Sequence, residues 1–188
     1  ADDAIAVSTI FMNTFLAGAG GVMAAATVTR LGFGKTDVIQ MLNGCIGGLV
    51  AITAEPLMPS PFAAILIGAV GGVIVVYGTK FLFALKIDDV VGAIPAHLFA
   101  GIWGTLAVPL TNPDTTFGAQ FLGVISINVF VFIVALAVWG IMKSTIGIRL
   151  SKEAELKGTD VVETGVIGYA IRDLSLIHIS EPTRRSYI

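Results

Sequence analysis

Long stretches of apolar residues alternate with short polar breaks along this chain. A helix that crosses a lipid bilayer needs about 20 mainly apolar residues in a row, and five stretches come near that length. The predicted membrane helices cover residues 4–29, 37–54, 61–85, 90–110 and 117–142. The breaks between them are rich in Gly, Pro, Asn and Asp, which favour turns. The pattern therefore predicts an all-α integral membrane protein, a bundle of about five antiparallel helices.

The composition agrees with a membrane location. Hydrophobic residues make up 55% of the chain, charged residues make up 13%, and the mean hydropathy is +0.91. The net charge of -2 and the scattered basic residues offer no basic surface for nucleic acid. Cys45 is the single cysteine and has no partner for a disulfide or a thiolate metal site. Because the chain opens at Ala1 without a methionine or a signal peptide, we expect an internal fragment.

The basic residues predict the orientation of the helices, because cytoplasmic loops are enriched in Lys and Arg. Basic residues lie at or after the ends of the first, third and fifth predicted helices, at Arg30, Lys35, Lys80, Lys86, Lys143, Arg149, Lys152 and Lys157. The charged residues of the opposite side are all acidic, at Asp2, Asp3, Glu55 and Asp114. We therefore expect the first residue outside the cell and a cytoplasmic tail over residues 143–173.

Several small or polar residues within the apolar stretches are interpreted as structural. Two glycine pairs, Gly44 with Gly48 and Gly68 with Gly72, have the spacing that lets helices approach closely. The asparagines within the stretches are expected to form hydrogen bonds between or within helices, and Trp103 to pack or to anchor an interface. Acidic residues at helix starts are expected to cap free backbone amides. The asparagines are Asn13 and Asn43, and the acidic residues are Asp37, Asp88 and Asp89.

His97 lies in the middle of the apolar stretch 90–110. Ionisable residues at membrane depth usually face a bundle interior or a substrate path. Gly101 and Gly104 follow His97 by four and seven residues, so they share its helix face. These glycines either let another helix pack closely, with His97 bound to a backbone carbonyl, or leave room for a conduit beside the imidazole. We favour the conduit because intramembrane ionisable residues are usually functional.

The last residues differ in character from the rest of the chain. The run from Leu174 to Arg184 (LSLIHISEPTR) resembles the translation, in one frame, of a widely used transposon sequencing-library adapter. We interpret residues 174–188 as a non-native, adapter-derived tail and exclude them from the functional analysis. His178 is therefore not considered as a ligand.

The remaining motifs resemble those of the ammonium transporter (Amt/Mep/Rh) family. Asp88-Asp89, His97 and the run AGIWGTL from Ala100 are similar to the penultimate helix of that family. Further similarity is carried by FMNT from Phe11, by NG from Asn43, by GLVAITA from Gly48, by GTD from Gly158 and by GYA from Gly168. The order and spacing fit over residues 1–173. The segment Ile94-Pro95-Ala96-His97-Leu98 departs from the family pattern of Phe-Gly-Val before the histidine and glycine after it.

The resemblance implies a fold of eleven transmembrane helices, of which this chain would hold the last five, assembled as a homotrimer in the cell membrane. It implies transport of ammonium or ammonia through a hydrophobic pore with a histidine pair at its middle. His97 would be one histidine of that pair, with Ala93, Ile94 and Gly101 lining the pore, and the other histidine would lie outside this chain. The resemblance implies neither an enzyme nor a cofactor or metal.

The resemblance also implies that the cytoplasmic tail contacts neighbouring subunits and a PII-type regulator. However, Thr164-Gly165-Val166 stands where the family commonly has His-Gly-Glu, which weighs against regulation through the tail. Three alternatives stay open. They are an Rh-like channel for ammonia or CO2, an ammonium sensor with a signalling domain, and an intramembrane enzyme. The enzyme is disfavoured because no second catalytic group lies at the depth of His97.

Overall fold

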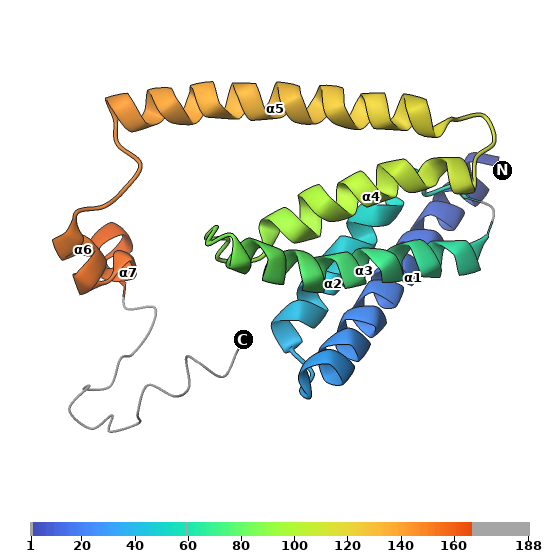
Figure 1. Ribbon diagram of the computed structural model, residues 1–188, viewed down its shortest axis with the longest axis horizontal. Helices are drawn as coiled ribbons and strands as arrows, with labels where there is room; N and C mark the ends of the chain where they lie inside the picture. The colour runs from blue at the N-terminus through green and yellow to red at the C-terminus, as the bar shows by residue number, and fades with distance from the viewer. Residues whose placement is uncertain (1, 59, 167–188) are drawn as a thin grey trace. The chain divides into compact units, whose positions relative to one another are not determined.

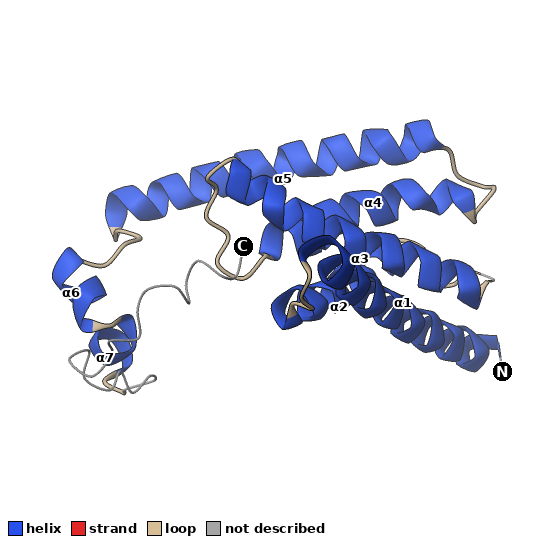
Figure 2. Ribbon diagram, turned by 60° about the horizontal axis from the view of Figure 1, so that its bottom comes forward, coloured by secondary structure: helices blue, strands red, loops and turns tan. Residues whose placement is uncertain are grey.

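The computed structural model describes residues 2–58 and 60–166, and every regular element of these residues is helical (Figures 1 and 2). This confirms the all-α prediction. The elements are α1 (Asp2–Phe33), α2 (Val38–Ile52), α3 (Pro61–Ala84), the π-helical turn η1 (Ile94–Phe99), α4 (Ala100–Ala107), the 3-10 turn η2 (Val108–Leu110), α5 (Phe117–Thr145), α6 (Lys152–Lys157) and α7 (Thr159–Thr164). The adapter-like residues 174–188 and the expected Gly168-Tyr169-Ala170 motif lie outside the described residues.

The chain divides into two compact units, with the boundary inside α5 between Phe132 and Ile133. The first unit holds the bundle of α1, α2, α3 and the segment Ile94–Leu110. The second unit holds the end of α5 and the short helices α6 and α7. The predicted division into a membrane part and a tail after residue 142 stays a prediction.

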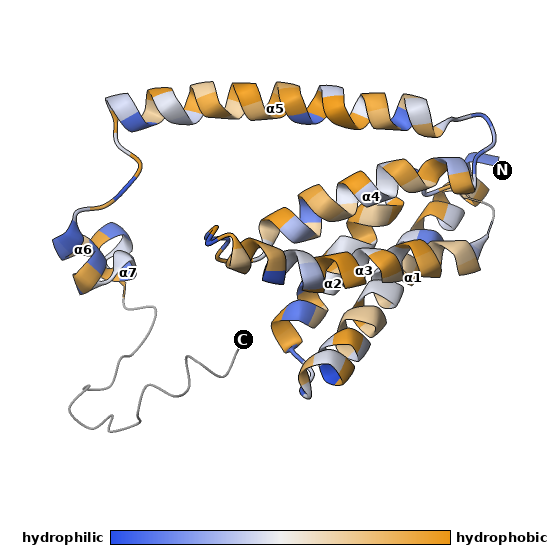
Figure 3. Cartoon of the chain, in the orientation of Figure 1, coloured by the Kyte–Doolittle hydropathy of each residue, from blue (hydrophilic) through white to orange (hydrophobic). Residues whose placement is uncertain are grey.

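Among the described residues, three helices are long and apolar enough to cross a membrane, namely α1, α3 and α5. Apolar residues dominate their ribbons in Figure 3. The other two apolar segments, Val38–Ile52 and Ile94–Leu110, are shorter. At 1.5 Å per residue, the 15 residues of α2 reach roughly 22 Å, less than the thickness of about 30 Å of the hydrocarbon layer. The helix begins one residue later and ends two residues earlier than the predicted range 37–54, where the chain turns at Thr53, and a membrane span at this segment stays a prediction.

Glycines let α1, α2 and α3 pack with their backbones in contact (Figure 1). A Cβ on Gly48 or Gly68 would overlap the carbonyl oxygen of Ala17, and one on Gly72 would overlap that of Gly21. These glycines are buried. The predicted role of the glycine pairs in close helix packing is confirmed, and all of these contacts converge on one face of α1.

Side-chain caps fix where α2 and α3 begin. Asp37 accepts a hydrogen bond from the backbone N–H of Gln40 at 3.0 Å, as predicted for a cap of the second helix. Ser60 accepts one from Ala63 N–H at 3.2 Å, and Pro61 occupies the first position of α3, where its missing N–H is tolerated.

The fourth apolar segment differs from the prediction of one helix over residues 90–110. Regular helix starts only after Gly92, which has a φ of 74°. This left-handed conformation suits glycine and interrupts any helix entering from Val90 and Val91. The segment then continues as a π-helical turn, an α-helix and a 3-10 turn.

Candidate pore site around His97

The start of the His97 segment is held by the carboxylate of Asp89. One oxygen, Oδ1, accepts a hydrogen bond from Ala93 N–H at 2.9 Å, and Oδ2 accepts one from Ile94 N–H at 2.8 Å. Pro95 has no N–H, and Ala96 N–H donates to the Gly92 carbonyl at 3.2 Å. All amides of the first turn are thus satisfied. The predicted capping role is confirmed for Asp89, and this helix start is not free to bind an anion.

Asn43 of α2 secures the turn that precedes the segment. Its Nδ2 donates to the Val91 carbonyl at 2.8 Å, and a Cβ on Gly92 would lie 2.5 Å from that nitrogen. The structural role predicted for Asn43 is therefore confirmed. The contact also explains why the turn needs glycine at position 92, on grounds of space as well as of backbone conformation.

The imidazole of His97 lies on an exposed face of the π-helical turn. Pro95, Ala96 and Ala100 of the same segment are buried against the bundle, whereas His97 is exposed. Within the described residues, no hydrogen-bond partner of its side chain is found. The alternative in which His97 binds a backbone carbonyl of a neighbouring helix therefore has no support in the described bundle. A turn of π-helix at this point fits the frequent occurrence of such turns at functional sites.

The other predicted pore residues surround His97 on this segment. Ala93 is exposed, and Ile94 and Gly101 are half-buried. A Cβ on Gly101 would meet only Val50 Cγ1, at 3.6 Å, an ordinary contact distance, so packing does not require glycine there. Gly104 behaves differently, because a Cβ on it would overlap the carbonyl oxygen of Ala51 in α2. The glycine face predicted from the sequence therefore splits into Gly104, which packs, and Gly101, which leaves space.

Two further residues singled out in the sequence have structural roles. Asn13 is buried in α1 and donates to the carbonyls of Pro56 and Met58, at 2.9 and 3.0 Å. The indole of Trp103 donates from Nε1 to the Ile67 carbonyl at 3.0 Å and packs against the buried core. Both roles agree with the predictions.

Gly78 of α3 was not identified from the sequence, although it contacts the His97 segment closely. Its only sequence signal is its position seven residues after Gly71, which places both glycines near one face of α3. A Cβ on Gly78 would lie 2.7 Å from Cδ2 of Phe99 and 3.1 Å from Cβ of Pro95. Pro95, two residues before His97, and Phe99, two residues after it, therefore both pack against Gly78.

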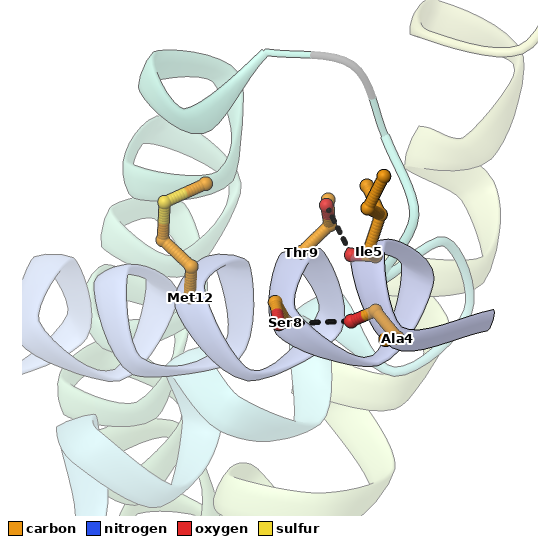
Figure 4. Close-up of a pocket in the computed structure, with 5 residues that line it drawn as sticks. All are labelled: Ala4, Ile5, Ser8, Thr9 and Met12. Carbon is orange, nitrogen blue, oxygen red and sulfur yellow. Dashed lines mark hydrogen bonds between the residues drawn. The ribbon is translucent and has the colours of Figure 1, made fainter. Parts of the chain in front are cut away.

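A shallow depression of about 320 Å³ lies elsewhere, on the first turns of α1 (Figure 4). It is lined by Ala4, Ile5, Ser8, Thr9 and Met12. The two hydroxyl groups donate to carbonyls of their own helix, those of Ala4 at 2.8 Å and Ile5 at 3.0 Å. With its hydroxyl protons bound in this way, the depression offers no converging polar groups for a ligand.

In the second unit, an ion pair joins the start of α6 to the residues before it. Arg149 donates from Nε and one terminal nitrogen to the two carboxylate oxygens of Glu155, at 2.7 and 3.1 Å. This hydrogen bonding lowers the pKa of the Glu155 carboxyl and raises the pKa of Arg149. Ser151 caps α6 by accepting from Ala154 N–H at 3.2 Å. The contacts give the predicted tail local order.

An ionisable ring on an exposed face of an apolar helical segment, in an all-helical membrane protein, is typical of proteins that conduct ions or small solutes. The profile of the Ammonium Transporter Family matches residues 1–169. The chain belongs to this family.

Relatives among curated proteins agree with this assignment. The chain is 37% identical over 183 residues to the ammonium transporter Amt2 of Archaeoglobus fulgidus, covering 87% of this chain and 39% of Amt2. It is 39% identical over 160 residues to a putative ammonium transporter of Synechocystis, covering 83% and 36% of the two chains. A solved structure named Sensor Amt Protein is 27% identical, with a TM-score of 0.78, covering 85% of this chain and 42% of that one. The chain thus spans about two fifths of the length of these relatives.

Proposed function

We propose that the protein to which this chain belongs moves ammonium or ammonia across the cell membrane through a hydrophobic pore, and that His97 contacts the substrate. Membership of the Ammonium Transporter Family, together with an exposed imidazole that has no hydrogen-bond partner among residues 2–58 and 60–166, carries the proposal. Ala93, Ile94 and Gly101 would line the pore beside it. The second histidine of the pair would come from a helix outside this chain.

Histidine suits the proposed role because of its chemistry. A bare ammonium ion entering an apolar pore loses its hydration at a large cost in free energy. Neutral imidazole is both a donor and an acceptor, and its ordinary pKa lies near physiological pH. His97 would therefore guide the substrate, or accept on a ring nitrogen the proton that ammonium gives up and pass it on.

The contacts at the two ends of the bundle support the proposed orientation. At one end, the ammonium group of Lys80 lies 3.0 Å from the centre of the Phe33 ring, which brings the basic ends of α1 and α3 together. At the other end, Asn112 donates to the Glu55 carboxylate at 3.0 Å. By the distribution of basic residues, the Lys80 end would face the cytoplasm. Assembly as a homotrimer and contact of the tail with a PII-type protein belong to the same proposal.

Replacing His97 by alanine in the full-length protein tests the proposal. We expect ammonium-evoked current in proteoliposomes to be abolished or to change its selectivity. Leu98→Ala is a matched control, because Leu98 is an exposed neighbour on the same turn that carries no polar group. Unchanged current and selectivity after His97→Ala, at equal protein in the membrane, would rule out a role of His97 in conduction.

A second candidate function is ammonium sensing, which the similarity to the Sensor Amt Protein favours. A sensor would couple ammonium binding to a signalling domain beyond the tail. The intact gene decides between the two functions, because only the sensor needs a signalling domain after the region of α6 and α7. Ammonium binding without any evoked current would likewise favour the sensor.

A further inference from the structure

The contact between Gly78 and the His97 segment is closer than ordinary packing. Gly78 is buried in α3, and a methyl group on it would lie 2.7 Å from Cδ2 and 3.2 Å from Cε2 of the Phe99 ring. The same methyl would lie 3.1 Å from Cβ of Pro95. Both neighbours are rings, which cannot bend away as the end of a flexible chain can. Only a hydrogen atom fits between α3 and the two rings.

The positions of these rings relate directly to the position of His97. Pro95 precedes His97 by two residues and Phe99 follows it by two. Two residues correspond to roughly half a turn of helix. Side chains that rest on α3 at positions 95 and 99 therefore direct the imidazole of His97 to the opposite side. The burial pattern agrees, because Pro95 is buried and His97 is exposed.

A further contact fixes the Phe99 ring from the side. Its centre lies 6.4 Å from that of Phe81, one turn along α3 from Gly78, with the ring planes tilted by 55°. The N–H of Ala100 donates to the Pro95 carbonyl, which closes the π-helical turn around His97. The turn is thus held on α3 by two aromatic rings, one proline and one glycine.

We propose that Gly78 is a positioning residue for His97. By admitting Pro95 and Phe99 to the surface of α3, it sets how far the imidazole projects from the bundle, and thereby the width and selectivity of the passage beside it. This inference rests on the proposed conducting role of His97. It gives α3 a part in selectivity, although no contact between α3 and the imidazole of His97 is found among the described residues.

Adding a methyl group at position 78 must displace the π-helical turn. Because the added methyl would lie 2.7 Å from the Phe99 ring and 3.1 Å from the Pro95 ring, we expect the turn to move outward by a fraction of an ångström. For comparison, a displacement of 1 Å can reduce the rate of an enzyme about 100-fold. We therefore expect Gly78→Ala to lower the ammonium current per protein molecule by about tenfold.

The decisive measurement is the ratio of methylammonium to ammonium current in the full-length protein, since this ratio does not depend on the amount of protein in the membrane. We expect Gly78→Ala to change the ratio at least about twofold. Phe99→Leu removes the ring and should also change the ratio. In the double variant the added methyl occupies the space left by the ring, so the ratio should return toward the wild-type value, a non-additive result for a contacting pair.

Gly18→Ala is the control for a methyl group added elsewhere in the bundle, because a methyl there would lie 2.9 Å from Cδ2 of Leu49, the movable end of a side chain of α2. It should leave the ratio unchanged. The proposal is overturned if Gly78→Ala leaves the ratio unchanged, if Gly18→Ala changes it equally, or if the double variant shows no recovery. Should Gly78→Ala fail to reach the membrane, Phe99→Leu alone decides, and an unchanged ratio overturns the proposal.

The His97→Ala variant separates this inference from the proposed function. If His97→Ala conducts normally, the proposed function fails and the position of the ring has no bearing on transport. If His97→Ala is inactive while the Gly78 and Phe99 variants retain the wild-type ratio, the proposed function stands and the positioning role of Gly78 is wrong.

Discussion

Asn13 offers the sharpest test of how the bundle is held together. Its side chain is fully buried in α1, and both protons of its Nδ2 are used by carbonyls of the loop between α2 and α3. Its Oδ1 is buried and has no partner within the described residues. Replacement by leucine keeps a similar shape but removes the donor and the acceptor. Replacement by aspartate keeps the shape and the acceptors but removes the donor.

The contacts of Asn13 indicate that Asn13→Asp should destabilise the protein more than Asn13→Leu. A hydrogen bond contributes a net of about 0.5–1.5 kcal/mol, and a buried carbonyl left without a donor costs about 1–3 kcal/mol. In Asn13→Leu, removal of the unpartnered Oδ1 offsets part of this loss, so we expect destabilisation by about 2 kcal/mol. In Asn13→Asp, at a pH that keeps the carboxyl ionised, carboxylate oxygens face the carbonyl oxygens of Pro56 and Met58, so the loss should exceed about 3 kcal/mol.

The assay is unfolding of the full-length protein in mixed detergent micelles, combined with hydrogen exchange of the amides in the loop 53–60. Asn128→Leu is a matched control, because the only acceptor of Asn128 within the described part of the chain is the carbonyl of Val124 in its own helix, at 2.8 Å. It should cost less than about 1 kcal/mol. The reasoning is refuted if Asn13→Asp is as stable as Asn13→Leu, or if neither variant speeds exchange in the loop.

Two further predictions concern the bundle and the tail. Gly72→Ala should destabilise the full-length protein by about 1–3 kcal/mol and lower its melting temperature, because the added methyl overlaps the backbone of α1. Gly32→Ala is the control. Position 32 has free space around it, so this variant should not lower the melting temperature. Because pairing with Arg149 lowers the pKa of Glu155, its contribution to tail order is present above the ordinary glutamate pKa and is lost as pH falls through the lowered value. Hydrogen exchange in α6 should therefore accelerate selectively below about pH 4, and a rate that does not change with acid, after correction for intrinsic exchange, would contradict this.

The sequence predicted the helices well because burial in lipid leaves a strong signal, a run of apolar residues of known length. It could not locate the start of the fourth segment. Asp88 and Asp89 both looked like caps, but only the contacts of Asp89 with Ala93 and Ile94 show where the helix begins. The left-handed turn at Gly92 depends on Asn43 of another helix, which no local pattern records.

The candidate site was predictable only in part, for a related reason. A histidine within an apolar stretch is conspicuous because it violates the surrounding pattern. Gly78 is inconspicuous because glycine is frequent in membrane helices, and its importance lies in what it touches. The sequence also could not show which of Gly101 and Gly104 packs closely against α2. This depends on the rotation of the segment Ile94–Leu110, which the π-helical turn alters.

The packing of the bundle explains why small residues, rather than large ones, control the position of His97. In lipid the hydrophobic effect does not drive helices together, so association relies on van der Waals contact and hydrogen bonds. Gly104 places the segment directly on the backbone of α2, and Gly78 places it on α3. Two such contacts on different helices fix both the depth and the rotation of the turn between them. A methyl group at either position would move the imidazole, although neither glycine touches it.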